Sequence, residues 1–334
     1  MSLVVQDLSK KYGTRTVVDH LSFEMNHPGV YALLGTNGAG KTTSIRMMLG
    51  MLSRDSGTVT WNGKPLDINN CNVGYLAEER GLYPKYTIMD QLMYFAALRG
   101  VSASEAKKRI HYWAERFDII EYLYPQEYAD IQAKKARMNE EASPKKKGLF
   151  GSSNQRKKRI APKTADQLSK GNQQKIQLIT ALAHDPHIVI LDEPFSGLDP
   201  VNAMLLKDVV KEEIAKGKIV LFSSHQMSYI EEFCDQIAII HTGKVVLHGD
   251  LHEIKRAYVR DRLVVNTVNP APIQAAFGGA CTMSDSGSLI IKLDAPAQKQ
   301  AVMKQLVDHY DIDEVKVFEP SLNDIFVEYT GEQS

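Results

Sequence analysis

A glycine-rich segment at residues 35–42 constrains the fold more than any other feature of this sequence. Its letters, GTNGAGKT, fit the phosphate-binding P-loop pattern, in which a lysine and a hydroxyl residue end the loop. The apolar run at residues 30–34 is a candidate buried strand, and a helix-like segment follows the loop. Strand, loop and helix in this order predict an α/β fold of the P-loop NTPase class. A glycine-rich turn with a chance lysine is the weaker alternative.

The loop predicts a binding site for a nucleotide and its magnesium ion. Successive backbone N–H groups and a helix N-terminus surround phosphate oxygens in such loops. We expect Lys41 to reach the β- and γ-phosphates, Thr42 to offer its hydroxyl to Mg²⁺, and Thr43 to support this site. The predicted ATP-binding residues of the loop are Gly35, Thr36, Asn37, Gly38, Ala39, Gly40, Lys41, Thr42 and Thr43.

A second apolar run, at residues 188–191, leads into two consecutive carboxylates. Asp192 is expected to hold the water shell of Mg²⁺, so that it completes a metal site with Thr42. Glu193 is expected to orient or activate the attacking water, since a general base must lie within hydrogen-bond reach of that water. A strand that ends in Asp-Glu is common by itself, but together with the P-loop it predicts an ATPase or a GTPase.

The hexapeptide LSKGNQ, at residues 168–173, selects among the P-loop classes. Ser169 and the amide of Gly171 stand at the start of a predicted helix over residues 172–183, where an anion binds well. Alone, the hexapeptide would be explained as a serine N-cap. It resembles the signature motif of the ATP-binding cassette (ABC) family, usually LSGGQ, and departs from it at Lys170 and Asn172.

Further motifs of that family follow in the family's order. Residues 196–199, SGLD, are similar to its D-loop. His225 falls where the family's switch histidine belongs, and Tyr12 falls where an aromatic ring stacks on adenine. Singly, Tyr12 is explained as well by a strand-end aromatic, and His225 by a satisfied histidine at a strand end. Taken together, the motifs give residues 1 to about 245 a resemblance to the ABC ATPases.

The resemblance implies how such a chain works. Two cassettes close head to tail, so that Ser169 and Gly171 of one complete the ATP site that the P-loop of the other forms. His225 then assists Glu193 in catalysis. Because the chain has one copy of each motif, it is expected to pair with itself or with a paralogue. The resemblance also implies a separate integral membrane permease, which holds this cytoplasmic chain at the inner face of the cell membrane.

One position departs from the family beside the predicted metal. The family usually has a glutamine about three dozen residues after the P-loop, where it contacts magnesium, and this chain has Glu78 there. A carboxylate also ligates Mg²⁺, so Glu78 is predicted as a metal ligand that adds negative charge beside the phosphates. Glu78, the SKGNQ form of the signature and the segment at residues 320–331 resemble the sodium-efflux and drug-export branch of bacterial ABC ATPases.

The sequence predicts two domains. Residues 1–249 are expected to form the ABC nucleotide-binding domain, an α/β P-loop NTPase cassette with a helical subdomain at about residues 86–183. Residues 250–334 are expected to form a small C-terminal α+β domain, which regulates or stabilises the dimer and takes no part in hydrolysis. Its predicted strands are 263–268, 289–293 and 314–318, and its predicted helices are 296–310 and 321–329.

A basic stretch at residues 133–163 interrupts the helical pattern. It holds eleven Lys or Arg against two Glu and has few apolar residues to bury, so it is predicted as an irregular insertion. Two interpretations stay open. The insertion contacts anionic lipid head groups or an acidic face of the permease, or it is a solvated loop with no partner.

The balance of charges and the lengths of the apolar runs argue against a nucleic-acid-binding protein and against a chain with spanning helices. Forty basic and forty acidic residues balance, so no nucleic acid is expected as a partner. No apolar run reaches the roughly 18 residues of a spanning helix.

Two rival functions stay open: a non-transport ABC ATPase of the translation or repair type, and a regulatory module with an inactive site. Translation types usually carry two cassettes and repair types a long coiled coil, and the intact catalytic residues argue against an inactive module.

Overall fold

The computed structural model describes residues 2–67, 71–79, 81–141, 160–258, 261–284 and 286–331. The chain divides into two compact units. Unit 1 comprises Met1–Cys234 and Ala238–Val245, and unit 2 comprises Asp235–Ile237 and Val246–Ser334. In the part of the chain that the structure describes, no helix combines the length and apolar character that crossing a bilayer requires.

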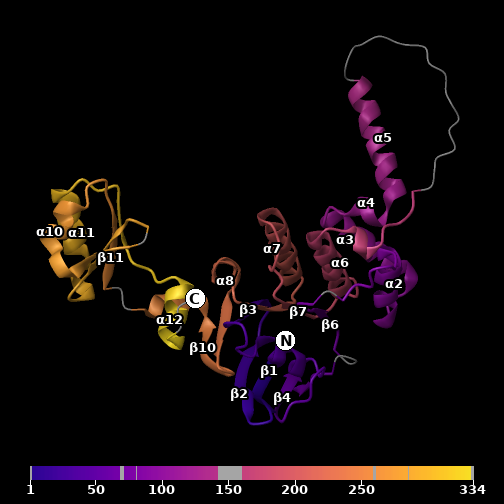
Figure 1. Ribbon diagram of the computed structural model, residues 1–334, viewed down its shortest axis with the longest axis horizontal. Helices are drawn as coiled ribbons and strands as arrows, with labels where there is room; N and C mark the ends of the chain where they lie inside the picture. Colours follow the sequence, from indigo (N-terminus) through magenta and orange to yellow (C-terminus); the bar gives the residue numbers. More distant parts are fainter. Residues whose placement is uncertain are drawn as a thin grey trace. The chain divides into compact units, whose positions relative to one another are not determined.

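Two sheets contain the strands of unit 1 (Figure 1). The smaller is antiparallel, with the order β2-β1-β4-β5, and consists of Arg15–Met25, Leu3–Tyr12, Ser56–Trp61 and Lys64–Pro65. The larger has the order β10-β9-β3-β8-β7-β6, and consists of Lys244–Asp250, Gln236–His241, Gly29–Leu34, Ile219–Ser224, Ile188–Asp192 and Val73–Leu76. Neighbours among β3, β8, β7 and β6 run parallel, and β3, β7 and β8 are buried throughout. The predicted α/β cassette is therefore confirmed.

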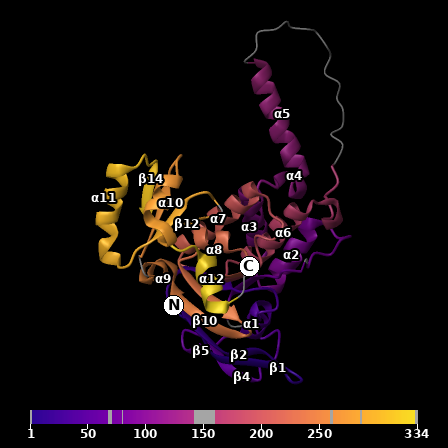
Figure 2. The ribbon, with the colours of Figure 1, turned by 60° about the vertical axis from the view of Figure 1, so that its left-hand side comes forward.

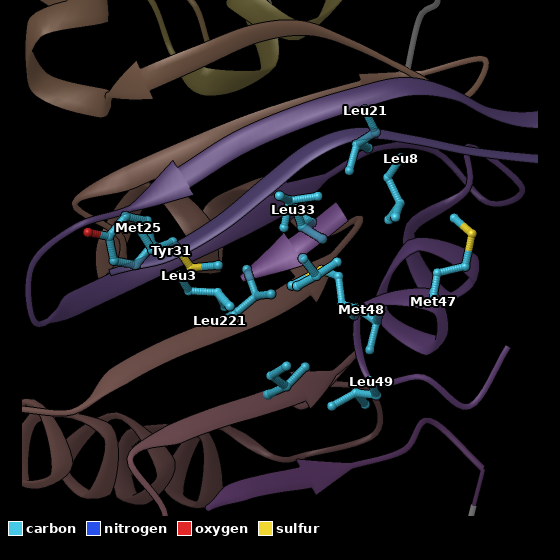
Figure 3. Close-up of a cluster of buried hydrophobic side chains, with 14 of the residues drawn as sticks. Leu3, Leu8, Leu21, Met25, Tyr31, Leu33, Met47, Met48, Leu49 and Leu221 are labelled. Atoms are coloured by element: carbon cyan, nitrogen blue, oxygen red, sulfur yellow. The ribbon is translucent and has the colours of Figure 1, made fainter. Parts of the chain in front are cut away.

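Helix α1, Lys41–Met48, follows the P-loop and packs in the core that both sheets share. Figure 3 shows leucines of the antiparallel strands, leucines of the parallel strands and the methionines of the helix pointing toward one another. The labelled contributors include Leu3, Leu8, Leu21, Leu33, Leu221, Met47 and Met48. Burying side chains of this size stabilises the fold by roughly 1.5–3 kcal/mol each. The core therefore fixes the position of the loop between β3 and α1.

The helical part of unit 1 consists of α2 to α6, namely Ile88–Leu98, Ala103–Arg116, Ile120–Leu123, Pro125–Glu141 and Lys170–Leu182. The side chains of Thr87 and Ser102 accept hydrogen bonds from the first turns of α2 and α3. Gly100, in the left-handed conformation at φ 74°, separates these two helices. The remaining elements are η1 (Ala165–Gln167), α7 (Pro200–Ala215) and α8 (Met227–Phe233).

Helix α5 corrects the prediction of an irregular stretch from residue 133. The helix continues to Glu141 and extends away from the other helices of its unit (Figure 1). Residues 131–136 are exposed, and alanine and lysine are strong helix formers that need no apolar face. The prediction is therefore wrong for residues 133–141, because low apolar content does not by itself exclude a solvent-exposed helix. Residues 142–159 lie outside the described part of the chain.

Unit 2 contains a four-stranded antiparallel sheet with the order β12-β13-β11-β14. Six elements follow one another along the chain: β11 (Arg262–Asn266), α10 (Ala271–Phe277), β12 (Cys281–Met283), β13 (Leu289–Lys292), α11 (Lys299–His309) and β14 (Glu314–Val317). This is the βαββαβ arrangement of split βαβ folds, and both helices lie beside the strands (Figure 2). Ile273 of α10 and Leu306 of α11 pack on the buried sheet residues Leu263, Val265, Leu289 and Ile291. The predicted α+β fold is confirmed, with α10 and β12 as additional elements. The unit also contains α9 (Leu251–Ala257), η2 (Gly278–Ala280), η3 (Pro296–Gln298) and α12 (Leu322–Thr330).

A buried ion pair joins α7 to the start of β8. Nζ of Lys218 binds Oε2 of Glu213 and lies 2.5 Å from Oδ1 of Asp185. The hydrogen bond from Lys218 lowers the pKa of Asp185. The stability that the Asp185 carboxylate contributes is therefore fully present above the pKa that this group has in the unfolded chain. This stability is lost only as the pH falls through the lower pKa of the folded chain.

Lys218→Met is expected to lower the free energy of unfolding by about 3–5 kcal/mol, because it leaves the buried Glu213 carboxylate without its buried cation and with only the half-exposed Lys216 as a partner. Urea denaturation measures the change. Lys216→Met is the matched control: Lys216 also pairs with Glu213, at 2.6 Å, but its side chain is 46% exposed, and its loss should cost under about 1 kcal/mol. Equal losses in the two variants would contradict the role of burial.

Candidate functional site

Close backbone packing shapes the P-loop. A Cβ atom on Gly35 would lie 2.5 Å from the carbonyl oxygen of Ile240, and one on Gly40 would lie 2.8 Å from that of Val17. Gly40 also has φ 108° where it caps α1, a conformation that other residues rarely adopt. Both positions therefore require glycine, and the loop is held between β2 and β9. Its backbone leads directly into the N-terminus of α1.

Lys41 is buried within the loop, with its side chain 6% exposed. Its Nζ donates hydrogen bonds to the carbonyl oxygens of Gly35, at 2.7 Å, and Thr36, at 3.3 Å. The same atom lies 3.4 Å from Oε1 of Glu193. The ammonium is thus positioned between the loop that would bind phosphate and the carboxylate predicted to act on water.

Asp192 ends β7 beside the P-loop helix. The hydroxyl of Thr42 donates to its Oδ1 at 3.3 Å, and the hydroxyl of Ser223 donates to the same oxygen. Its other oxygen, Oδ2, is buried and makes no hydrogen bond. An unsatisfied buried carboxylate oxygen next to a threonine hydroxyl fits a hydrated Mg²⁺, which usually takes only one or two protein ligands. The described residues hold no cluster of three or more His, Cys, Asp or Glu side chains suited to a metal.

Glu193 occupies a constrained turn after β7. Its φ of 49° is unusual for a residue other than glycine. Its N–H lies 3.1 Å from the hydroxyl and 3.2 Å from the carbonyl oxygen of Ser223, and Nδ1 of His225 lies 3.0 Å from its Oε1. Oε1 is buried and makes no hydrogen bond of good geometry despite these neighbours. The carboxylate is thus near Lys41 and His225 and retains capacity to accept a hydrogen bond from water.

Ser223 is a site residue that sequence reasoning missed. It pairs with Asp192 across the parallel strands β7 and β8, so one hydroxyl contacts both acidic residues. Its only local signal is a small polar residue at the end of a fully buried strand. Ser223 can be recognised as a site residue only when the long-range pairing of β7 with β8 is known.

Ser223→Ala is expected to lower kcat for ATP hydrolysis by about 10- to 100-fold, because residues that orient the ligands of a metal contribute at this scale. Coupled-enzyme measurement of phosphate release tests it. Ser224→Ala is the neighbouring control, since the Ser224 hydroxyl accepts from the N–H of Gln226 rather than contacting either carboxylate. Equal kcat values for Ser223→Ala and the unchanged chain would contradict this role.

Glu78 joins the same site from the end of β6. It lines a cavity of about 80 Å³ with Asp192, Glu193 and two glutamines of α6, Gln174 and Gln177. The parallel pairing of Leu76 with Leu191 brings the two chain segments together. The structure therefore places Glu78 beside both carboxylates of β7.

The other predicted ATP contacts lie on separate elements. Tyr12 ends β1, is half-exposed, and pairs with Arg15 in the hairpin that leads to Val17 behind the P-loop. Ser169 is exposed and caps α6 by accepting a hydrogen bond from Asn172 at 3.3 Å, so this helix begins at Lys170, earlier than predicted.

Comparison with known proteins agrees with this geometry. Residues 18–196, more than half of the chain, match the protein family described as ABC transporter. Residues 249–330 match the family described as ATP-binding protein DrrA1-3-like, C-terminal domain.

Individual relatives extend this likeness. The chain is 36% identical over 331 residues to the uncharacterized ABC transporter ATP-binding protein YhaQ of Bacillus subtilis (strain 168), with 98% of each protein covered. It is 30% identical over 256 residues to the Nod factor export ATP-binding protein I of Ralstonia nicotianae, covering 75% of this chain and 68% of that one. A solved structure described as an ATP binding subunit of an ABC transporter is 27% identical, with a TM-score of 0.61, and covers 77% of this chain and 92% of its own.

Proposed function

This chain belongs to the ABC transporter ATP-binding proteins, and we propose that two copies of it close head to tail on Mg-ATP to drive a separate membrane permease. Membership makes it an ABC transporter ATPase that binds ATP. The further proposal concerns the pairing, the metal, the roles of individual residues and the direction of transport.

One observation carries the proposal: a single chain supplies the P-loop, Asp192 and Glu193 to one site, while Ser169 caps a different helix and is exposed. An exposed helix N-terminus is a suitable site for an anion. A second copy, turned head to tail, would place its Ser169 and Gly171 against the phosphates held by residues 35–42. Each closed pair would then contain two complete ATP sites, with adenine stacked on Tyr12.

In this mechanism, different residues of the chain bind the phosphates, hold the metal and act on water. The P-loop amides and Lys41 would bind the phosphates, and Thr42, Asp192 and Glu78 would hold Mg²⁺ with its waters. Bound Mg²⁺ neutralises charge on the phosphates. Glu193 orients the attacking water, and His225, 3.0 Å away, keeps that carboxylate in place. Ser223 holds Asp192 at the end of β7 and Glu193 in the turn that follows it.

The permease is proposed to dock on a groove of mixed apolar and polar lining at the edge of the helical part. A cavity of about 460 Å³ is lined by Met51, Leu82, Phe95 and Leu98, together with Glu79 of the segment after Glu78. Exposed tyrosines 83, 86 and 94 line a second cavity close by in sequence. Exposed apolar and aromatic patches of this kind mark protein interfaces. Contact here places the chain at the cytoplasmic face of the membrane, and likeness to a Nod factor export protein supports an exporter.

Copurification tests the permease contact. A tagged chain, purified from a detergent extract of its own cells, is expected to retain a multi-spanning membrane protein identified by mass spectrometry. Tyr86→Asp should reduce that recovery at least about tenfold, since a buried aromatic at an interface often contributes more than 1.4 kcal/mol. Tyr128→Asp, at an exposed tyrosine of α5, is the control. Recovery of no membrane protein, or equal recovery in both variants, would contradict this docking site.

A further inference from the structure

We propose that Gln174 is a positioning residue that connects the two ATP sites of the dimer. It joins the helix that carries Ser169 to the turn that carries Glu193. Engagement of Ser169 with ATP on the partner's P-loop would thereby set the catalytic carboxylate that acts on the chain's own ATP. This inference rests on the head-to-tail pairing proposed above.

The first support is a hydrogen bond at the catalytic turn. Nε2 of Gln174 donates to the carbonyl oxygen of Pro194, the residue directly after Glu193. On the other side of the turn, the N–H of Glu193 is bound by Ser223. A residue held at φ 49° persists only where its surroundings fix it. Gln174 and Ser223 are thus two of the groups that hold the turn in place.

The second support is the helix itself. Ser169 caps α6, and Gln174 lies five residues further along, about 7.5 Å by helical rise. Gln173 donates to the carbonyl oxygens of Ala165 and Leu168, which ties the segment before Ser169 to the same helix. The helix and its cap therefore form one hydrogen-bonded unit. A displacement at Ser169 reaches Gln174 without passing through a loop.

The third support is where the amide lies. Gln174 lines the cavity of about 80 Å³ that also contains Glu78, Asp192 and Glu193. The turn is packed from a further side by Phe195, whose ring stacks on Tyr229 of α8 with centroids 4.5 Å apart and planes 10° apart. Of the three contacts, from Ser223, Tyr229 and Gln174, the one from Gln174 comes from the helix that Ser169 caps.

A purely structural role for Gln174 predicts different results from a positioning role. A structural residue would lower the thermal midpoint and weaken Mg-ATP binding along with activity. A positioning residue would change the rate of hydrolysis within an assembled dimer. The comparison therefore needs kcat, KM, the thermal midpoint and the molar mass with Mg-ATP, all measured on the full chain.

Gln174→Leu removes the amide donor and keeps a similar size. We expect kcat to fall about 10- to 100-fold, which is the scale for loss of a supporting hydrogen bond at a metal site. KM should stay within about twofold of that of the unchanged chain. The thermal midpoint and the Mg-ATP-dependent dimer should be retained. Gln132→Leu, the same change at an exposed position of α5, is the control and should match the unchanged chain. Unchanged kcat in Gln174→Leu, or parallel losses of kcat, KM and stability, would overturn the inference.

Mixed dimers test whether Gln174 acts on the Glu193 of its own chain, as the inference requires. Chains with two different tags allow isolation of dimers in which Glu193→Gln silences one site. With Gln174→Leu in the chain that keeps Glu193, hydrolysis at the remaining site should be slow. With both changes in one chain, the remaining site uses an unchanged Gln174–Pro194 contact and should hydrolyse ATP at about the rate of the singly silenced dimer. Equal rates in the two arrangements would overturn the inference, whereas an unchanged chain that forms no dimer would contradict the proposed pairing and the inference with it.

Discussion

Glu193→Gln is expected to slow ATP hydrolysis by about 10²- to 10⁴-fold while the chain still binds Mg-ATP. The amide keeps the size of the side chain but loses the charge that orients or activates water. The phosphate-binding groups remain, because Lys41 also bonds to the loop carbonyls and Thr42 to Asp192. Bound ATP should therefore persist.

Two measurements separate this role from a structural one. Single-turnover hydrolysis reports the chemical step, and equilibrium titration with a fluorescent ATP analogue reports binding. If Glu193 only bridged Lys41 and His225, binding and hydrolysis would weaken together, or the thermal midpoint would fall. Near-normal turnover in Glu193→Gln would remove this residue from catalysis.

Lys41→Ala is expected to weaken ATP binding by about 10- to 100-fold, because hydrogen bonds to charged groups contribute about 1.5–3 kcal/mol. The buried ammonium is the cation positioned inside the loop, 3.4 Å from Glu193. Its loss should strongly reduce the Mg-ATP-dependent dimer at ATP concentrations near the Kd of the unchanged chain, where binding this much weaker leaves few sites occupied. The same fluorescent titration measures the affinity.

Lys135→Ala, at an exposed position of α5, serves as the control for Lys41→Ala and should bind ATP normally. Circular dichroism establishes that both variants are folded. An affinity for ATP in folded Lys41→Ala equal to that of the control would contradict the phosphate-binding role of this lysine.

Local chemistry explains which site residues the sequence predicts. The P-loop is contiguous in sequence: a Cβ atom on its Gly35 or Gly40 would lie within 3 Å of backbone, and its lysine and threonine follow directly. Asp192 and Glu193 follow an apolar strand whose pattern is visible without the fold. Each of these signals lies within about ten residues of chain, so periodicity and turn chemistry are enough to find it.

Residues that depend on pairing between distant segments are harder to predict. Ser223 becomes a site residue only because β8 lies beside β7, and Gln174 only because α6 passes the turn after Glu193. In unit 2, β12 has three residues and α10 has seven, too few for a periodic pattern to stand out. Helix α5 was missed for another reason: its exposed residues give no apolar stripe, although their propensity is helical.

The molar mass of Glu193→Gln in solution, measured by light scattering after size exclusion, tests the head-to-tail account most directly. The chain has a mass of 37.4 kDa, so the account predicts this value without nucleotide and twice it, 74.8 kDa, with Mg-ATP. Adding Ser169→Arg to the same chain should restore the monomer in Mg-ATP, because the larger side chain would occupy the space of the partner's phosphates. A mass of 37.4 kDa for Glu193→Gln with saturating Mg-ATP, or a dimer that Ser169→Arg leaves intact, would contradict the account.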